Sequence, residues 1–514
     1  MAEFVKLNPA ELKQLHTVDQ RLMSYNVEMT EITGGTFWKE YTPAQIAGTE
    51  PFQFDGNFGN GFTAMASLMQ YYPPINLYDE RLRALSKELG SAWVRVSGSW
   101  ATKTYYDLDG KMEGKVPESF QATLTKEQWI GVLDFVKAID GKLLISVGNG
   151  AGNHPNGGPI DLSQTEMIFN FSHEYGVDID AFEFMNEPNM LEMSGAPHGY
   201  TPADFVRDQD LANGWVREHY PNCLIVGPCT CDGMLGSEVG EEKEEQTPTE
   251  KMGAGLGNVM QSCSTADLMN GAQVKLDVYS YHYYNGISER IAPMMPQGHW
   301  LPETAHTEPY LAVAPDLAAR HTKNRDKYVP GGQMWVTESG DAGGGGDTWA
   351  STYLDVLRTL NELGGFAKVT DGVIFHNTLA SSDYGFLKHG SFEPRPNYFA
   401  VLLWNRLMGS TVYDAGIPVT EGAHVYCHSR KDGKEGCVYL IINNSLTEST
   451  TVELPSTALR YTLTGEHDMR SSVMSLNGKA LTISGVAELP DLSGEQWPAG
   501  KVELVPGSCS FFVL

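Results

Sequence analysis

Short apolar runs recur along the chain, and stretches with a helical pattern separate them. Eight such runs span residues 23–29, 93–98, 142–148, 181–186, 223–227, 276–284, 333–338 and 372–377. Nearly continuous apolar runs of this length are typical of parallel strands buried on both faces. Eight of them alternating with helices predict a (β/α)8 TIM barrel, an α/β fold. The alternative, an open doubly wound sheet, would need a glycine-rich phosphate loop after its first strand, and the sequence has none there.

One intervening segment carries a well-defined helix start. Thr125 and Gln128 form a capping box, because the threonine hydroxyl and the glutamine side chain can bond the first free amides. Apolar residues from Trp129 to Val136 then share one face at helical spacing. The other segments with helical character are 80–89, 164–175, 202–219, 315–328 and 349–363.

The pattern changes after a last predicted helix at 397–408. Alternating or β-branched runs follow, with turns such as Asn477-Gly478 between them, at 424–426, 438–442, 450–454, 481–483 and 510–514. This pattern predicts a C-terminal all-β sandwich packed on the barrel. We therefore divide the chain into a polar lead-in at 1–23 that packs on the β domain, a catalytic barrel at 24–409 and a β-sandwich at 410–514.

The charge balance restricts the partners. The 514 residues include 36 basic and 64 acidic ones, a formal net charge of -28, and 41% are hydrophobic. A chain with this net negative charge is not expected to bind nucleic acid or an anionic membrane. Because the basic residues do not form a patch, binding of a long sulfated polyanion is also disfavoured. No run approaches the roughly 20 apolar residues of a membrane span, so we expect no membrane insertion.

The cysteines and the N-terminal residues do not determine the cellular compartment of the protein. Seven cysteines are an odd number, most of them expected to be buried thiols, and Cys427 and Cys437 would pair across a turn if the protein is exported. Residues 1–6 lack the apolar core of a signal peptide, which is consistent with a cytosolic protein or with a trimmed signal. The acidic segment 238–251 is expected to be a solvated excursion.

Two carboxylates follow apolar strands far apart in the sequence. Glu187 ends the fourth predicted strand, and Glu338 ends the seventh, just before a glycine-rich stretch. Barrel active sites lie at the carboxyl ends of the strands, so both side chains should meet in one cleft. A retaining glycosidase needs such a pair: one carboxylate attacks the sugar, and the other gives and later takes a proton. We assign Glu338 as the nucleophile and Glu187 as the acid/base.

Polar residues next to these carboxylates suit the same chemistry. The amide of Asn186 can hydrogen-bond a sugar 2-hydroxyl. A tyrosine after the sixth strand could hydrogen-bond Glu338 and keep it ionised; we choose Tyr283, and strand alternation leaves Tyr284 open. The proposed chemistry requires no metal or cofactor, and the histidines show no ligand spacing.

Several motifs together resemble glycoside hydrolase family 79 of clan A, which contains β-glucuronidases, heparanases and a leech hyaluronidase. They are Asn186-Glu187-Pro188-Asn189, Tyr281 to Gly286, Glu338 with its glycine cluster, Leu22 to Glu28, Val94 to Ser99 with Lys103-Thr104, Asp383-Tyr384-Gly385 and Pro394 to Tyr398. The likeness spans about residues 20–410. It implies that Glu28, Ser99, Asn186 and His282 contact the sugar.

The resemblance also implies a site for a glucuronate carboxylate. By position, the backbone amides of Gly344 and Gly345 and the hydroxyl of Tyr384 would hold it, since amide donors bind an anion without a counter-charge. The chain departs from the family where Glu28 replaces the usual aspartate, where Gly343 replaces a tyrosine, and in the loop 149–154, which lacks the lysine cluster of heparanases.

The sequence therefore predicts a retaining β-glucuronidase that acts on terminal glucuronic acid of glucuronides or glycosaminoglycan-like oligosaccharides. The alternatives are an endo-acting heparanase- or hyaluronidase-like enzyme, another clan A β-glycosidase and, more remotely, a non-catalytic carbohydrate-binding protein. The family resemblance favours a secreted or periplasmic location.

Overall fold

The computed structural model describes residues 4–54, 67–231, 263–293 and 296–514 of the chain. The acidic segment 238–251, for which we predict a solvated excursion, lies outside these residues. Within the described ranges, no helix combines the length and apolar character that crossing a bilayer requires.

Eight parallel strands close into a barrel, in which the last strand pairs with the first. In chain order they are β3 (Met23–Glu28), β6 (Trp93–Ser97), β9 (Lys142–Ser146), β10 (Ala181–Glu183), β11 (Leu224–Cys231), β12 (Val278–Ile287), β13 (Gln333–Gly343) and β14 (Ile374–His376). Each of the eight predicted apolar runs contains or overlaps one of these strands. The prediction of a (β/α)8 barrel is confirmed.

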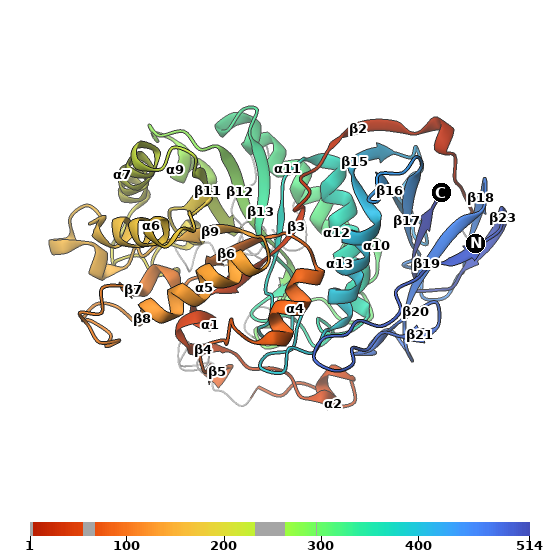
Figure 1. Cartoon of the computed structure of the whole chain (residues 1–514), viewed down its shortest axis with the longest axis horizontal. Helices are drawn as coiled ribbons and strands as arrows, with labels where there is room; N and C mark the ends of the chain where they lie inside the picture. Colours follow the sequence, from red (N-terminus) through yellow and green to blue (C-terminus); the bar gives the residue numbers. More distant parts are fainter. Residues whose placement is uncertain (1–3, 55–66, 232–262, 294–295) are drawn as a thin grey trace.

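The longer helices surround the barrel strands (Figure 1). They are α4 (Glu80–Glu88), α5 (Lys126–Ala138), α6 (Ser163–Tyr175), α7 (Pro202–His219), α11 (Val313–Tyr328), α12 (Leu354–Val369) and α13 (Pro396–Leu407). The predicted capping box starts α5: Thr125 N donates to Gln128 Oε1 at 2.8 Å, and Gln128 N donates to Thr125 Oγ1 at 3.3 Å. The apolar face of α5, from Trp129 to Val136, is buried in the core.

Shorter elements lie in the connections between the barrel strands and the longer helices. The short α-helices are α1 (Met29–Thr33), α2 (Pro43–Ile46), α9 (Thr265–Met269) and α10 (Glu308–Leu311). The 3-10 turns are η1 (Pro9–Glu11), η3 (Ala101–Lys103), η4 (Ala151–Asn153), η5 (Pro155–Gly157), η6 (Pro188–Met190) and η7 (Pro296–Gly298). Two small sheets follow the first two barrel strands: β4 (Gly35–Trp38) pairs with β5 (Met69–Tyr72), and β7 (Thr104–Asp107) pairs with β8 (Ala122–Thr125).

The C-terminal region forms two sheets, as predicted. One contains β1 (Phe4–Lys6), β18 (Thr450–Leu454) and β23 (Gly500–Leu504). The other contains β2 (Lys13–Thr17), β15 (Met408–Asp414), β16 (His424–Arg430), β17 (Cys437–Ile442), β24 (Cys509–Val513), β19 (Ala458–Gly465), β20 (Met474–Leu476), β21 (Lys479–Ala480) and β22 (Glu495–Trp497). The predicted run 481–483 follows β21 and is not a strand. Figure 1 shows this region beside the barrel, with α12 and α13 between them.

The core of the sandwich joins the two sheets. Val5 and Val452 from the smaller sheet belong to the same buried cluster as Val425 and Tyr439 from the larger one. The lead-in contributes β1 to one sheet and β2 to the other. Cys427 and Cys437 lie on neighbouring strands as free, buried thiols.

Candidate active site

Glu187 lies four residues beyond β10, at the carboxyl end of the barrel. Its backbone is in the left-handed region, with φ 45°, and the η6 turn follows directly. Ser194 Oγ donates to the carbonyl of Glu187 at 2.9 Å, which ties this turn to the next loop. The residue is 8% exposed. The turn therefore directs a nearly buried carboxylate from the edge of β10 toward the neighbouring strands.

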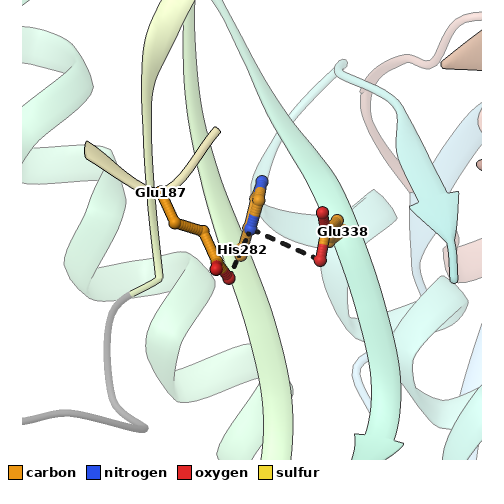
Figure 2. A group of neighbouring side chains, drawn as sticks. All are labelled: Glu187, His282 and Glu338. Atoms are coloured by element: carbon orange, nitrogen blue, oxygen red, sulfur yellow. Dashed lines mark hydrogen bonds and ion pairs between the residues drawn. The ribbon is translucent and has the colours of Figure 1, made fainter. Parts of the chain in front are cut away.

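Glu338 lies inside β13 and not at its end. The strand continues to Gly343, because β12 and β13 pair as far as Ile287 and Gly343. Our expectation that the strand ends at Glu338 was wrong. One oxygen of Glu187, one oxygen of Glu338 and a nitrogen of His282 all lie within 4.8 Å of one another (Figure 2). The two carboxylates that the sequence pairs are thus neighbours.

His282 stands between the two carboxylates, as Figure 2 shows. Its Nδ1 lies 3.1 Å from Glu187 Oε1 and 3.6 Å from Glu338 Oε2, and its Nε2 lies 3.1 Å from Cys229 Sγ. Burial favours the neutral imidazole, but Cys229, Glu338 and Glu187 outweigh burial and hold the pKa of His282 well above its usual value. This shift favours a protonated imidazole between the two carboxylates.

Arg95, on β6, is a buried cation that the sequence motifs did not assign to the site. Its Nε donates to Glu183 Oε2 at 2.7 Å, its Nη1 to Glu338 Oε1 at 3.0 Å and its Nη2 to Asn186 Oδ1 at 2.8 Å. Burial works to raise the pKa of Glu338, yet His282 and Arg95 keep that pKa below its usual value. The site thus favours an ionised Glu338.

The tyrosine that contacts Glu338 is Tyr284, so our choice of Tyr283 was wrong. Tyr284 Oη donates to Glu338 Oε2 at 2.8 Å. Side chains alternate along a strand, so Tyr284 shares a face with His282 whereas Tyr283 takes the opposite one. The charges nearest to Tyr283 are those of Arg358 and its partners on α12, outside the barrel strands.

An asparagine connects this tyrosine to the predicted sugar-binding residues. Asn377 Nδ2 donates to Tyr284 Oη at 2.9 Å and to Tyr384 Oη at 3.2 Å, and Asn377 Oδ1 accepts from Asn26 Nδ2 at 3.1 Å. Glu28 is buried close by. Burial, followed by the charge of Glu338, raises the pKa of Glu28 well above its usual value, which favours a neutral carboxylic acid there.

The remaining predicted residues differ in their placement. Asn186 is buried, and its Oδ1 accepts a hydrogen bond from Arg95; among the described residues no acceptor is found for its amide nitrogen. Ser99 lies half-buried in the turn after β6, and among the described residues no hydrogen bond joins it to either carboxylate. Gly344 and Gly345 follow β13 with φ of 92° and 91°, and Ser382 Oγ donates to the carbonyl of Gly345 at 2.8 Å. The glycines therefore have conformations that disfavour other residues.

Glu187, His282 and Glu338 also have the spacing of metal ligands. A ligating imidazole must be neutral, however, and the raised pKa of His282 opposes this. The guanidinium of Arg95 already occupies one oxygen of Glu338. The arrangement therefore suits proton transfer and nucleophilic attack better than metal binding.

Comparison with known proteins bears on this site. No protein-family model matches the chain. Heparanase-like protein 1 from Arabidopsis thaliana is 24% identical over 474 residues, covering 82% of this chain and 81% of the relative. Baicalin-beta-D-glucuronidase from Scutellaria baicalensis is 30% identical over 185 residues, covering 34% of this chain and 35% of the relative. The resemblance to glycoside hydrolase family 79 is confirmed.

The fold agrees with that of a solved glycosidase. The crystal structure of a 4-O-alpha-L-rhamnosyl-beta-D-glucuronidase from Fusarium oxysporum 12S matches with a TM-score of 0.63 over 100% of both chains, at 13% identity. At this identity the match shows the shared fold alone. The relatives, whose names are those of a heparanase-like protein and a glucuronidase, support the conclusion that the chain is a glycoside hydrolase acting on carbohydrate.

Two charged residues of the site were not predicted from the motifs, but their position in the sequence is unusual. Arg95 stands between two valines, and Glu183 stands between two phenylalanines, in runs that are otherwise apolar. A charge in the middle of a doubly buried strand needs a partner inside the barrel. Their contact at 2.7 Å is such a pair.

Proposed function

We propose that the protein is a retaining β-glucuronidase that removes terminal β-D-glucuronic acid from glucuronides or glycosaminoglycan-like oligosaccharides. The observation that carries the proposal is the approach of Glu187 and Glu338 to within 4.8 Å. Retaining glycosidases have carboxyl groups about 5–5.5 Å apart, whereas inverting ones need about 6.5–9.5 Å to admit a water molecule. The close approach of the nearest oxygens supports the retaining mechanism.

In the first step, Glu338 attacks the anomeric carbon of the sugar. The bond between that carbon and the leaving oxygen breaks, and the proton of Glu187 passes to the leaving oxygen. The product is a glycosyl ester of Glu338. Hydrogen bonds from Arg95 and Tyr284 to Glu338 support this role, because they favour the ionised nucleophile and fix its orientation.

In the second step, water attacks the same carbon while Glu187 accepts its proton. The ester bond breaks, Glu338 leaves as a carboxylate, and the sugar keeps its β configuration. His282 Nδ1 lies 3.1 Å from Glu187 Oε1. At this distance His282 can orient the carboxylate of Glu187 through a hydrogen bond while that carboxylate accepts the proton.

A uronic acid as the sugar is supported by hydrogen-bond donors in the loop that follows β13, the strand of the proposed nucleophile. The amide nitrogens of Gly344 and Gly345 have no acceptor within the described residues, and Tyr384 Oη is linked through Asn377 to Tyr284. Such donors can hold an anion. The name of the Scutellaria relative, a baicalin glucuronidase, points to the same substrate class.

A second candidate is an endo-acting, heparanase-like enzyme. The name of the Arabidopsis relative favours it. The net charge of -28 weighs against a long sulfated chain as the substrate. Another clan A β-glycosidase activity is the remaining alternative.

The test compares aryl β-glucuronides with the matching glucosides, galactosides and xylosides. We expect the highest kcat/KM for the glucuronide, and proton NMR should detect the β-anomer of free glucuronic acid first. Oligosaccharides ending in glucuronic acid should release the monosaccharide without fragments of intermediate length. Intermediate fragments would indicate endo action, and a preferred glucoside would refute the glucuronidase proposal.

A further inference from the structure

We propose that Arg290 is the positioning residue that turns the glycine loop, residues 343–346, into an anion-binding loop. Arg290 would act through that loop to select a charged sugar. The inference rests on the proposed function, because it assumes that the sugar carries a carboxylate.

Arg290 is 1% exposed and lies three residues beyond β12. Its Nη1 donates to the carbonyls of Gly344 and Gly346 at 3.2 and 2.7 Å. Its Nη2 forms an ion pair with Asp383 and donates to the carbonyl of Lys39 at 2.5 Å. One side chain thus holds two carbonyls of the glycine loop and anchors them to two other segments of the chain.

Two serines hold the same loop from either side. Ser288 Oγ donates to the carbonyl of Gly344 at 3.0 Å, and Ser382 Oγ donates to the carbonyl of Gly345 at 2.8 Å. With Arg290, they give a protein donor to every carbonyl from Gly344 to Gly346. The carbonyls of the loop therefore face the protein.

The amide groups of Gly344 and Gly345 face the other way, whereas that of Gly346 donates to the carbonyl of Ala342 at 3.1 Å. In a trans peptide the N–H points opposite to the preceding carbonyl, so the N–H of Gly345 points away from Arg290, which binds the carbonyl of Gly344. In the described part of the chain, neither the amide of Gly344 nor that of Gly345 donates to a backbone or side-chain acceptor. The loop consequently presents two free donors on one side, in the manner of a backbone anion nest.

The path of the loop requires glycine. The φ angles of Gly344, Gly345 and Gly346 are 92°, 91° and 82°. A Cβ at Gly344 would lie 2.3 Å from Ile291 Cδ1, and one at Gly345 would lie 2.5 Å from Trp38 Cβ. A loop built in this conformation has little freedom to reverse its peptide groups, provided that its carbonyls stay bound.

Geometry, more than charge, should carry the effect of Arg290. Asp383 pairs with the guanidinium and compensates its positive charge. Lysine could keep that ion pair, but its single ammonium group cannot reproduce the planar fork that reaches both carbonyls and Asp383 together. Arg290→Lys therefore removes the loop-holding geometry while it keeps the charge.

The experiment measures KM and kcat for an aryl β-glucuronide and Ki for D-glucuronate and uncharged D-glucose. The variants are Ser288→Ala, which removes one carbonyl donor, and Arg290→Lys. The control is Arg358→Lys, a buried arginine on α12 whose partners are Asp355 and Glu362. All four proteins are first compared by circular dichroism and thermal melting.

We expect KM for the glucuronide and Ki for glucuronate to rise together, about 2- to 10-fold in Ser288→Ala and about 10- to 150-fold in Arg290→Lys. The value of kcat and the Ki for glucose should change little, because a loop that only binds the carboxylate contributes uniform binding. Arg358→Lys should change the melting temperature and not the ratio of the two Ki values.

Equal rises for glucuronate and glucose would overturn the inference. An unchanged Ki for glucuronate in Ser288→Ala would also overturn the inference. This second result serves as the test if Arg290→Lys fails to fold. In both cases a wild-type preference for the glucuronide would leave the proposed function standing. A wild-type enzyme without that preference would overturn the proposed function, and this inference with it.

Discussion

Replacing Tyr284 by phenylalanine removes one atom from the site. Its hydroxyl donates to Glu338 Oε2 at 2.8 Å and accepts from Asn377 Nδ2 at 2.9 Å. The ring is buried, so phenylalanine keeps its shape and packing. Asn377 Nδ2 loses one of its two acceptors and retains Tyr384 Oη at 3.2 Å. The variant therefore removes the hydrogen bond to the proposed nucleophile together with the one from Asn377.

The size of the effect follows from the charge of Glu338. A hydrogen bond to a charged group contributes about 1.5–3 kcal/mol, which corresponds to about 10- to 150-fold in kcat/KM. Arg95 remains bound to the other oxygen of Glu338, and His282 remains 3.6 Å away. Because these two cations still orient and ionise the carboxylate, we expect a loss near the lower end, about 10- to 30-fold.

The pH dependence gives a second readout with a defined sign. The nucleophile must be ionised, so activity falls as the pH drops through the pKa of Glu338 in the free enzyme. Tyr284 is one of the groups that hold this pKa below its usual value, against the effect of burial. Removing its hydroxyl should raise the pKa of Glu338, so the acid limb of kcat/KM should move to higher pH.

Tyr283→Phe is the matched control. Tyr283 is the adjacent tyrosine and equally buried, but its nearest charges belong to Arg358 and the partners of that arginine on α12. Its kcat/KM should stay within about twofold of wild type, with an unmoved acid limb. Equal losses in the two variants, or a larger loss in Tyr283→Phe, would refute the assignment of Tyr284 to the nucleophile.

Three further predictions concern the carboxylates and their partners. Glu338→Ala should abolish turnover, whereas Glu187→Ala should spare aryl glucuronides with good leaving groups and yield a β-configured azide adduct with azide; an α-configured adduct would reverse the two roles. Arg95→Met should lower the urea-derived free energy of unfolding by about 3–5 kcal/mol, because it leaves buried carboxylates unpaired. Arg406→Met, at an exposed ion pair with Glu88, should lower it by less than about 1 kcal/mol. Burial raises the pKa of Glu31 to about 8, so the folded state holds a proton that the unfolded state releases, and wild-type stability should fall as the pH rises from about 4.5 to 8. Glu31→Gln should lose this slope of up to about 1.4 kcal/mol per pH unit, and parallel stability curves for the two proteins would contradict the assignment.

The barrel could be predicted because its strands are buried on both faces. Such strands are nearly continuous apolar runs, which composition alone distinguishes from the amphipathic helices between them. The extent of β13 could not be predicted in this way. Beyond Glu338 the strand continues through Ser339 to Gly343, where polar and small residues replace the apolar pattern. Pairing with β12, and with β14 at Ser339, keeps the chain extended there.

The identity of the tyrosine at the nucleophile depended on a bulge. Tyr281 pairs with Val336, but the next residue, His282, pairs with Glu338, so Thr337 is an extra residue in β13. A bulge changes which side chains of two neighbouring strands share a face. The alternation of side chains along β12 shows which residues of that strand share a face. It does not show which of the two faces lies against Glu338.

Charge balance inside the barrel links the acid role of Glu187 to the packing of the site. Two buried basic side chains, Arg95 and His282, face the carboxylates of Glu183 and Glu338. In the first step of the proposed mechanism the proton of Glu187 leaves with the departing oxygen while the ester neutralises Glu338, so one negative charge disappears and another appears. The second step reverses both changes. We therefore infer that the basic side chains face the same total charge before and after each step, which avoids an uncompensated buried charge at the ester intermediate.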